Sequence, residues 1–200
     1  MSEKIDRRKA RTKQLLHEAL IILIQEKGSD GVTVTDITNR ADINRGTFYL
    51  HYRDVADMLE QWKEEAFEHI RSLVRQLDVM ELREYAQRDE PYPKMVSIFE
   101  EIARNAPFFK TMFGPKGDPA YMTQYRELMI SHIFGKMDYY KPTREGLLVP
   151  LDYLIAYISS ANLGVVMHWI QTDFQQSPQE IGHILSRIFN HGPLASMGLK

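Results

Sequence analysis

The sequence predicts an all-α protein of about nine helices, and three kinds of signal support this. Apolar residues recur at intervals of three and four, first at Leu16, Ala19, Leu20, Leu23 and Ile24. Capping boxes open two segments, Thr33-Val34-Thr35-Asp36 and Ser177-Pro178-Gln179-Glu180. Glycine and proline separate the segments, as in the run Gly-Pro-Lys-Gly-Asp-Pro at 114–119. We therefore expect short loops between helices.

Composition narrows the class of protein. The 200 residues are 44% hydrophobic, which is enough for a sizeable core, and the chain has no cysteine. A disulfide framework, thiolate catalysis and cysteine zinc sites are therefore excluded. The start of the chain is charged and lacks the pattern of a signal peptide, so we expect a cytoplasmic protein.

Charge is unevenly distributed along the chain. Residues 1–53 carry ten Lys or Arg against seven Asp or Glu, a net charge of +3, whereas residues 54–200 carry fifteen against twenty, a net −5. Six of the ten basic residues lie between Lys4 and Lys13. A polyanion partner at this end of the molecule and an ordinary solvated helix start explain the pattern equally well.

The first 53 residues predict a helix-turn-helix. One helix ends at Gly28, a second follows the cap Thr33 and ends at Asp42, and a third follows the cap Asn44. On the third helix Phe48 and Tyr52 lie four residues apart on one face. We expect that face to pack against three residues of the first two helices: Leu20, Ile24 and Ile37.

The other faces of the third helix carry groups suited to DNA. Arg45 can hold a guanine edge with two hydrogen bonds, and Gly46 allows close backbone approach. Thr47, Tyr49 and His51 can donate to phosphate oxygens or touch a thymine methyl. Three ordinary helices with a polar surface are the alternative, so spacing alone favours DNA binding only modestly.

Residues 15–59 resemble the DNA-binding domain of the TetR family of bacterial transcriptional regulators. The resemblance rests on "EKG" at 26–28, "TVTDI" at 33–37, "INRGTFYLHY" at 43–52, and Leu59. It implies a homodimer on a palindromic operator, with a helical C-terminal domain that binds a small effector. It also implies DNA contacts by Thr33, Thr35, Arg45, Gly46, Thr47, Tyr49 and His51.

The sequence departs from the family pattern at two positions. Asp42 stands where the family usually has glycine in the turn, although Asp tolerates the left-handed conformation better than most residues. Val55 stands where the family commonly has a phosphate-binding lysine, so Arg53 or the basic N-terminus is expected to substitute. With Arg53 and the helix cap Asn44, nine residues form the expected DNA-binding set.

Residues 54–200 are expected to form the effector-binding and dimerisation domain, beside a DNA-binding domain of residues 1–53. Helices are predicted over about 55–76, 94–105, 107–113, 120–139, 151–172 and from 178 onward. Loops are predicted at 88–93 and around Pro142 and Gly146. The apolar stretch 146–170 contains Pro150, Asp152, Asn162 and His168, which favours a buried helix over a membrane span.

Two further sets of residues are predicted in this domain. Small and apolar stripes on the last two helices, together with the resemblance, predict a dimer interface of Ala161, Gly164, His168, Ile181, Ile184, Leu185 and Ile188. An apolar effector pocket with a few polar anchors is predicted from Phe99, Phe109, Tyr125, Tyr153, Tyr157, Asn162 and Met167. The alternative for each residue of the second set is plain core, because an aromatic residue or Met at helical spacing more often belongs there.

Rival functions have weaker support. The sequence contains no G-x-S-x-G, Walker, G-x-G-x-x-G or H-E-x-x-H motif, so we expect neither an enzyme nor a cofactor. Glu180 and His183 form an isolated pair, which is more typical of a surface than of a metal site. The stronger alternative is a DNA-binding protein of the same fold that is controlled by a protein partner.

Overall fold

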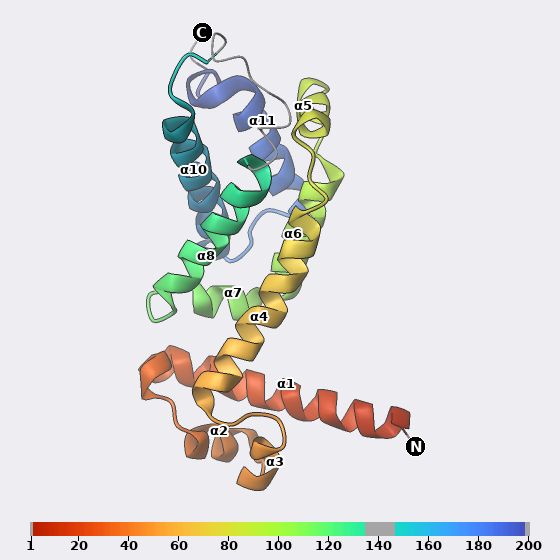
Figure 1. The fold of residues 1–200 in the computed structure, drawn as a ribbon, viewed down its shortest axis with the longest axis vertical. Helices are drawn as coiled ribbons and strands as arrows, with labels where there is room; N and C mark the ends of the chain where they lie inside the picture. Colours follow the sequence, from red (N-terminus) through yellow and green to blue (C-terminus); the bar gives the residue numbers. More distant parts are fainter. Residues whose placement is uncertain (1, 135–146, 199–200) are drawn as a thin grey trace. The chain divides into compact units, whose positions relative to one another are not determined.

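The computed structural model describes residues 2–134 and 147–198, and the regular secondary structure of this part of the chain is helical (Figure 1). The expected loop around Pro142 and Gly146 and the end of the helix predicted over 120–139 lie outside the described residues. The helices are α1 (Ser2–Lys27), α2 (Val34–Ala41), α3 (Arg45–Tyr49), α4 (Val55–Val74), α5 (Val79–Gln87), α6 (Pro93–Arg104), α7 (Ala106–Met112), α8 (Pro119–Met129), α10 (Leu151–Gln171) and α11 (Pro178–Ser196). A short 3-10 turn, η1 (Ser29–Gly31), follows α1, and a π-helical turn, η2 (Ile130–Phe134), follows α8.

The chain forms two compact units. Unit 1 comprises residues 1–66 and 107–119, and unit 2 comprises residues 67–106 and 120–200. The division falls inside α4, and α7 from residue 107 onward belongs to unit 1 with the following loop, although this segment lies far along the sequence. The functional division expected at residues 53 and 54 stays a prediction.

Unit 1 has an apolar centre built from α1, α2, α3 and the start of α4. The five residues predicted to pack together are all at most 2% exposed: Leu20, Ile24, Ile37, Phe48 and Tyr52. Burial of such side chains contributes roughly 1.5–3 kcal/mol each. The predicted inner face of the third helix is therefore confirmed.

The segment Pro107–Pro119 is attached to the rest of unit 1 at several points. The Lys116 ammonium donates to the carbonyls of Gln25 and Glu26 at 2.9 Å each, which are among the last carbonyls of α1. These carbonyls have few partners within the helix, and a cation suits that end of the helix dipole. The Lys63 ammonium donates to the Asp118 carboxylate at 2.5 Å, which joins α4 to the loop.

Unit 2 is organised around α11, which packs against α6 and α5 (Figure 1). Gly182 lies at the closest approach, because a Cβ there would come within 3.0 Å of the Val96 side chain. Trp169 on α10 meets Phe99 on α6 edge to face, with ring centroids 5.5 Å apart. Its indole N–H donates to the Gln176 carbonyl at 2.8 Å, so its polar edge is satisfied.

The helices α2, α3 and α11 begin at the capping residues that the sequence predicted. Thr33 with Asp36 and Ser177 with Glu180 both form complete capping boxes, and Asn44 caps α3 by accepting from the Gly46 N–H at 2.8 Å. The helix α5 was not predicted from the sequence. Asp78 caps this helix by accepting from the N–H groups of Met80 and Glu81, but no glycine or proline separates it from α4.

Two further predictions need correction. The third helix ends at Tyr49, so Tyr52 lies in the turn beyond it. Tyr52 is still on the buried side, because its N–H donates to the Phe48 carbonyl at 3.0 Å as in a continued helical turn. The helix α10 is also less buried than expected: it is long and apolar enough to cross a membrane by length and composition, but only 22% of that stretch is buried.

Candidate nucleic-acid interface

The turn between α2 and α3 depends on Asp42. This residue adopts a left-handed conformation, with φ of 52°, and its N–H donates to the Asn39 carbonyl at 3.4 Å. Left-handed backbone is disfavoured for residues with a Cβ, although Asp and Asn adopt it more readily than most. The turn therefore forms without the expected glycine.

The start of α2 is held by a small charged network. The Asp36 carboxylate accepts from the Lys27 ammonium at 2.5 Å, and from the N–H and hydroxyl of Thr33 at 2.9 and 2.6 Å. The Lys27 ammonium first, and then the Thr33 donors, lower the pKa of Asp36 to about 2. The hydroxyl of Thr33 is thus engaged in capping, whereas Thr35 is exposed on the first turn of α2.

The helix α3 presents its polar residues outward. Phe48 is fully buried, while Arg45 and Gly46 are exposed and the Tyr49 side chain is 50% exposed. The Arg45 guanidinium donates to the Tyr49 hydroxyl at 3.3 Å, so both groups lie on one face. Thr47 is half-buried at the edge of that face.

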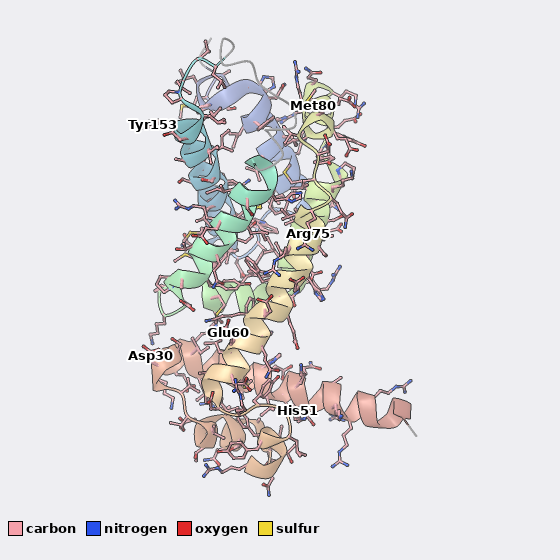
Figure 2. All side chains as sticks on the ribbon, viewed as in Figure 1. Asp30, His51, Glu60, Arg75, Met80 and Tyr153 are labelled. Atoms are coloured by element: carbon pink, nitrogen blue, oxygen red, sulfur yellow. The ribbon has the colours of Figure 1, made fainter. Side chains whose placement is uncertain are left out.

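His51 follows α3 and lies close to the basic part of α1 (Figure 2). Its partial burial, and then the positive charges of Lys13 and Lys9, lower its pKa. The Lys13 ammonium also lies 6.0 Å from the centre of the Tyr52 ring and pairs with Glu65 at 2.6 Å. The basic N-terminal helix and the end of α3 therefore share one side of unit 1.

Arg53 is held by the start of α4. Its guanidinium donates to the Asp57 carboxylate at 3.0 and 3.3 Å, and its backbone N–H donates to the same carboxylate at 2.9 Å. The side chain is 86% exposed, so it reaches solvent with its charge partly balanced. Arg53 is thus a weaker replacement for the missing lysine at Val55 than an unpaired arginine would be.

Sequence reasoning missed His17. Its ring stacks on Trp62 with centroids 4.2 Å apart, and its Nε2 lies 3.1 Å from the Tyr52 hydroxyl. Burial lowers the pKa of His17 to about 4, against an opposing effect of Glu65. The neutral ring joins α1, the turn after α3, and α4 behind the exposed face. No local pattern reveals this role, because its partners lie 35 and 45 residues away.

The residues predicted to line an effector pocket differ in their burial. In unit 2, Phe99 and Tyr125 are buried, but Tyr153 and Tyr157 are 71% and 54% exposed. Asn162 and Met167 are half-buried, and Phe109 belongs to unit 1, where it is buried. The two exposed tyrosines face solvent in the single chain.

Unit 1 contains a surface hollow of about 650 Å³. Its walls come from the loop before α2, the start of α4 and the loop 114–119, with Val55 in one wall and Lys63 and Asp118 together in another. None of the seven predicted effector-pocket residues lines it. Within residues 2–134 and 147–198 the structure contains no group of three or more His, Asp and Glu side chains placed to hold a metal ion.

Family models match both parts of the chain. Residues 16–61 match the model of bacterial regulatory proteins of the tetR family, and residues 89–191 match the C-terminal region of transcriptional regulators of the same family. The chain belongs to the TetR family. Family membership therefore accounts for both the helix-turn-helix and the helical C-terminal region.

One curated relative matches a short part of the chain. The uncharacterized transcriptional regulator YxbF of Bacillus subtilis (strain 168) is 39% identical over 59 residues. That match spans 29% of this chain and 16% of the length of YxbF.

Solved TetR-family structures share the fold. A TetR transcriptional regulator from Streptococcus agalactiae 2603V has a TM-score of 0.59 and 20% identity, covering 95% of this chain and 99% of its own. The regulator FadR from Bacillus subtilis, in complex with stearoyl-CoA, has a TM-score of 0.58 and 13% identity, covering 90% and 98%. At these identities the likeness establishes the fold alone.

Proposed function

We propose that this TetR-family chain is a repressor that binds a palindromic operator as a homodimer and is released by a small-molecule effector. The observation that carries the proposal is the division of α3 into a buried Phe48 and an exposed set of Arg45, Gly46 and Tyr49. A short helix with a polar, basic and aromatic outer face suits the major groove. We also propose that the nine residues of the expected DNA-binding set contact the operator.

Dimerisation is proposed through α10 and α11. On α10, the stripe of Tyr157, Ala161, Gly164 and His168 is exposed, although the helix is the most apolar of the described chain. Such a face calls for a covering partner, since soluble monomers rarely expose large apolar patches. Tyr153 and Tyr157 fit this covered face better than an interior pocket.

The second helix of the proposed interface contributes only part of its predicted stripe. Ile184 is 39% exposed and Ile188 is half-buried, so both can reach a partner. Ile181 and Leu185 are 3% and 8% exposed, because that side of α11 packs against α6 in the same chain. We therefore propose that the dimer uses α10 together with Ile184 and Ile188.

Regulation follows from linkage between two states of the dimer. Two α3 helices must sit about 34 Å apart to enter successive major grooves. An effector can release DNA only through a higher affinity for a state with a different spacing. The stearoyl-CoA in the FadR structure belongs to that protein. For this chain we propose an uncharged or modestly polar ligand that is partly aromatic or lipophilic.

The DNA-binding proposal is tested by selecting duplexes from a random pool with the full chain. We expect enrichment of a palindrome whose half-sites repeat about 10 base pairs apart or at a multiple of that spacing. Sedimentation at micromolar protein concentration should give twice the chain mass. A single-chain mass or a lack of enrichment would contradict the proposal.

Control by a small molecule is tested separately from DNA binding. We expect one member of a metabolite and drug panel both to raise the thermal midpoint and to release the selected duplex. If only a protein partner releases the duplex, the alternative of a regulator controlled by protein docking is supported instead.

A further inference from the structure

The residue that follows α3, Leu50, was not assigned to the DNA interface from the sequence. Leu50 follows α3 directly and is 83% exposed. This exceeds the exposure of the other large hydrophobic side chains exposed in the described part of unit 1: Leu15, Ile22 and Tyr49, at 38, 40 and 50%. A single exposed apolar residue is unremarkable in itself, so its position must carry the argument.

The backbone fixes the direction of Leu50. Its φ and ψ of −74° and −16° continue the helix, and its N–H donates to the Thr47 carbonyl at 3.3 Å. Each residue turns a helix by about 100°, so the residues two before and two after Phe48 lie about 160° from it. Phe48 is the fully buried residue of α3. Gly46 and Leu50 therefore point almost directly away from the core.

Leu50 is an apolar side chain on an otherwise polar surface. Arg45 and Tyr49 lie to one side, joined by their hydrogen bond, and Gly46 adds no side chain next to Leu50. A leucine side chain cannot donate or accept a hydrogen bond, so it cannot read a base amide, carbonyl or ring nitrogen. The apolar feature of a base edge in the major groove is the C5-methyl group of thymine.

We propose that Leu50 determines operator specificity by packing against the methyl group of one thymine in each half-site. The inference rests on the proposed binding of α3 in the major groove and adds a base identity to it. Covering one methyl group contributes about a fourfold change in affinity. Arg45 would read a guanine by hydrogen bonds while Leu50 reads a thymine by apolar contact.

Replacing thymine by uracil tests this directly, because the exchange removes only the C5-methyl group. Duplexes from the selection with the full chain are remade with uracil at each thymine in turn. The wild-type protein is expected to lose about fourfold in affinity at one thymine per half-site. Leu50→Ala is expected to bind more weakly overall and to show no further loss at that thymine.

A matched control removes a leucine from elsewhere on the same unit. Leu15→Ala changes an exposed leucine of α1 and should respond to uracil as the wild type does. Thermal unfolding of both variants checks that they remain folded. Equal uracil losses in wild type and Leu50→Ala would overturn the inference, as would a wild type that tolerates uracil at every thymine.

A second variant, Leu50→Gln, tests the role of Leu50 by the base that the protein selects. Selection with Leu50→Gln should enrich another base at the same position, since an amide pairs with adenine rather than with a methyl group. An unchanged consensus would overturn the role of Leu50 while leaving DNA binding intact. If the wild type enriches no duplex at all, the proposed function fails together with the inference.

Discussion

At the scale of single residues, His17 shows how much of unit 1 depends on contacts between distant parts of the chain. The residues Thr33, Asn44 and Asp36 were predictable, because a helix cap and its partner lie within three positions of each other. His17 was not predictable, because its partners Tyr52 and Trp62 come from other elements. Because His17 packs against those two rings, its protonation is a test of how α1, α4 and the turn after α3 pack together.

The low pKa of His17 predicts a stability change with pH. The folded protein resists protonation of His17 down to a pKa of about 4, whereas the unfolded chain takes up the proton near pH 6.5. The contribution should be complete above about pH 6.5 and should fall as the pH drops towards 4, by at most roughly 3 kcal/mol. Denaturant unfolding across this range measures it.

Two variants assign that change to His17. In His17→Phe the slope contributed by this residue should disappear, since phenylalanine has no proton to bind. Leu15→Ala changes an exposed side chain of the same helix that binds no proton, and it should leave the slope unchanged. An unchanged slope in His17→Phe would contradict the burial described for the ring.

Arg45 tests the polar side of α3. If its guanidinium reads a base, Arg45→Ala should weaken operator binding by roughly 1–3 kcal/mol and relax the sequence preference at one position. Anisotropy titrations with selected and shuffled duplexes measure both effects. A loss of equal size on both duplexes would instead identify Arg45 as a phosphate contact.

At the scale of elements, helix starts were predictable from local chemistry and helix lengths were not. The starts of α2 and α11 coincide with their capping boxes. α3 ends earlier than its apolar spacing predicted, and α5 was missed because the chain between it and α4 contains no helix-breaking residue. Tertiary packing decides such boundaries, and local propensity is only a weak guide to it.

Asp42 tests the turn between α2 and α3. Its φ of 52° is easier for glycine than for aspartate, so Asp42→Gly should raise the free energy of unfolding by about 0.5–1 kcal/mol. Asp42→Ala should lower it, because alanine lacks the side chain that helps aspartate adopt this conformation. Chemical denaturation gives both values. A destabilised Asp42→Gly would show that the carboxylate stabilises the turn in another way.

At the scale of the whole molecule, the outer face of α3 could be predicted from the sequence, whereas an effector pocket could not be located from it. The outward set on α3 follows from helical spacing and a known buried face, which one short segment contains. A pocket depends on how several helices pack, and the apolar residues that would line it have the same composition as core. Tyr153 and Tyr157 are exposed in the single chain, and their place in an effector pocket stays a prediction.

The central claim is that two copies of α3 read one palindromic operator, and a titration of selected duplex with protein tests it most directly. Fluorescence anisotropy at physiological salt should show two chains per duplex and an affinity at least about 10³-fold above that for a shuffled duplex. The affinity should also fall steeply as salt is raised, because phosphate contacts release counterions. Equal affinity for the two duplexes, or one chain per duplex at saturation, would contradict the claim.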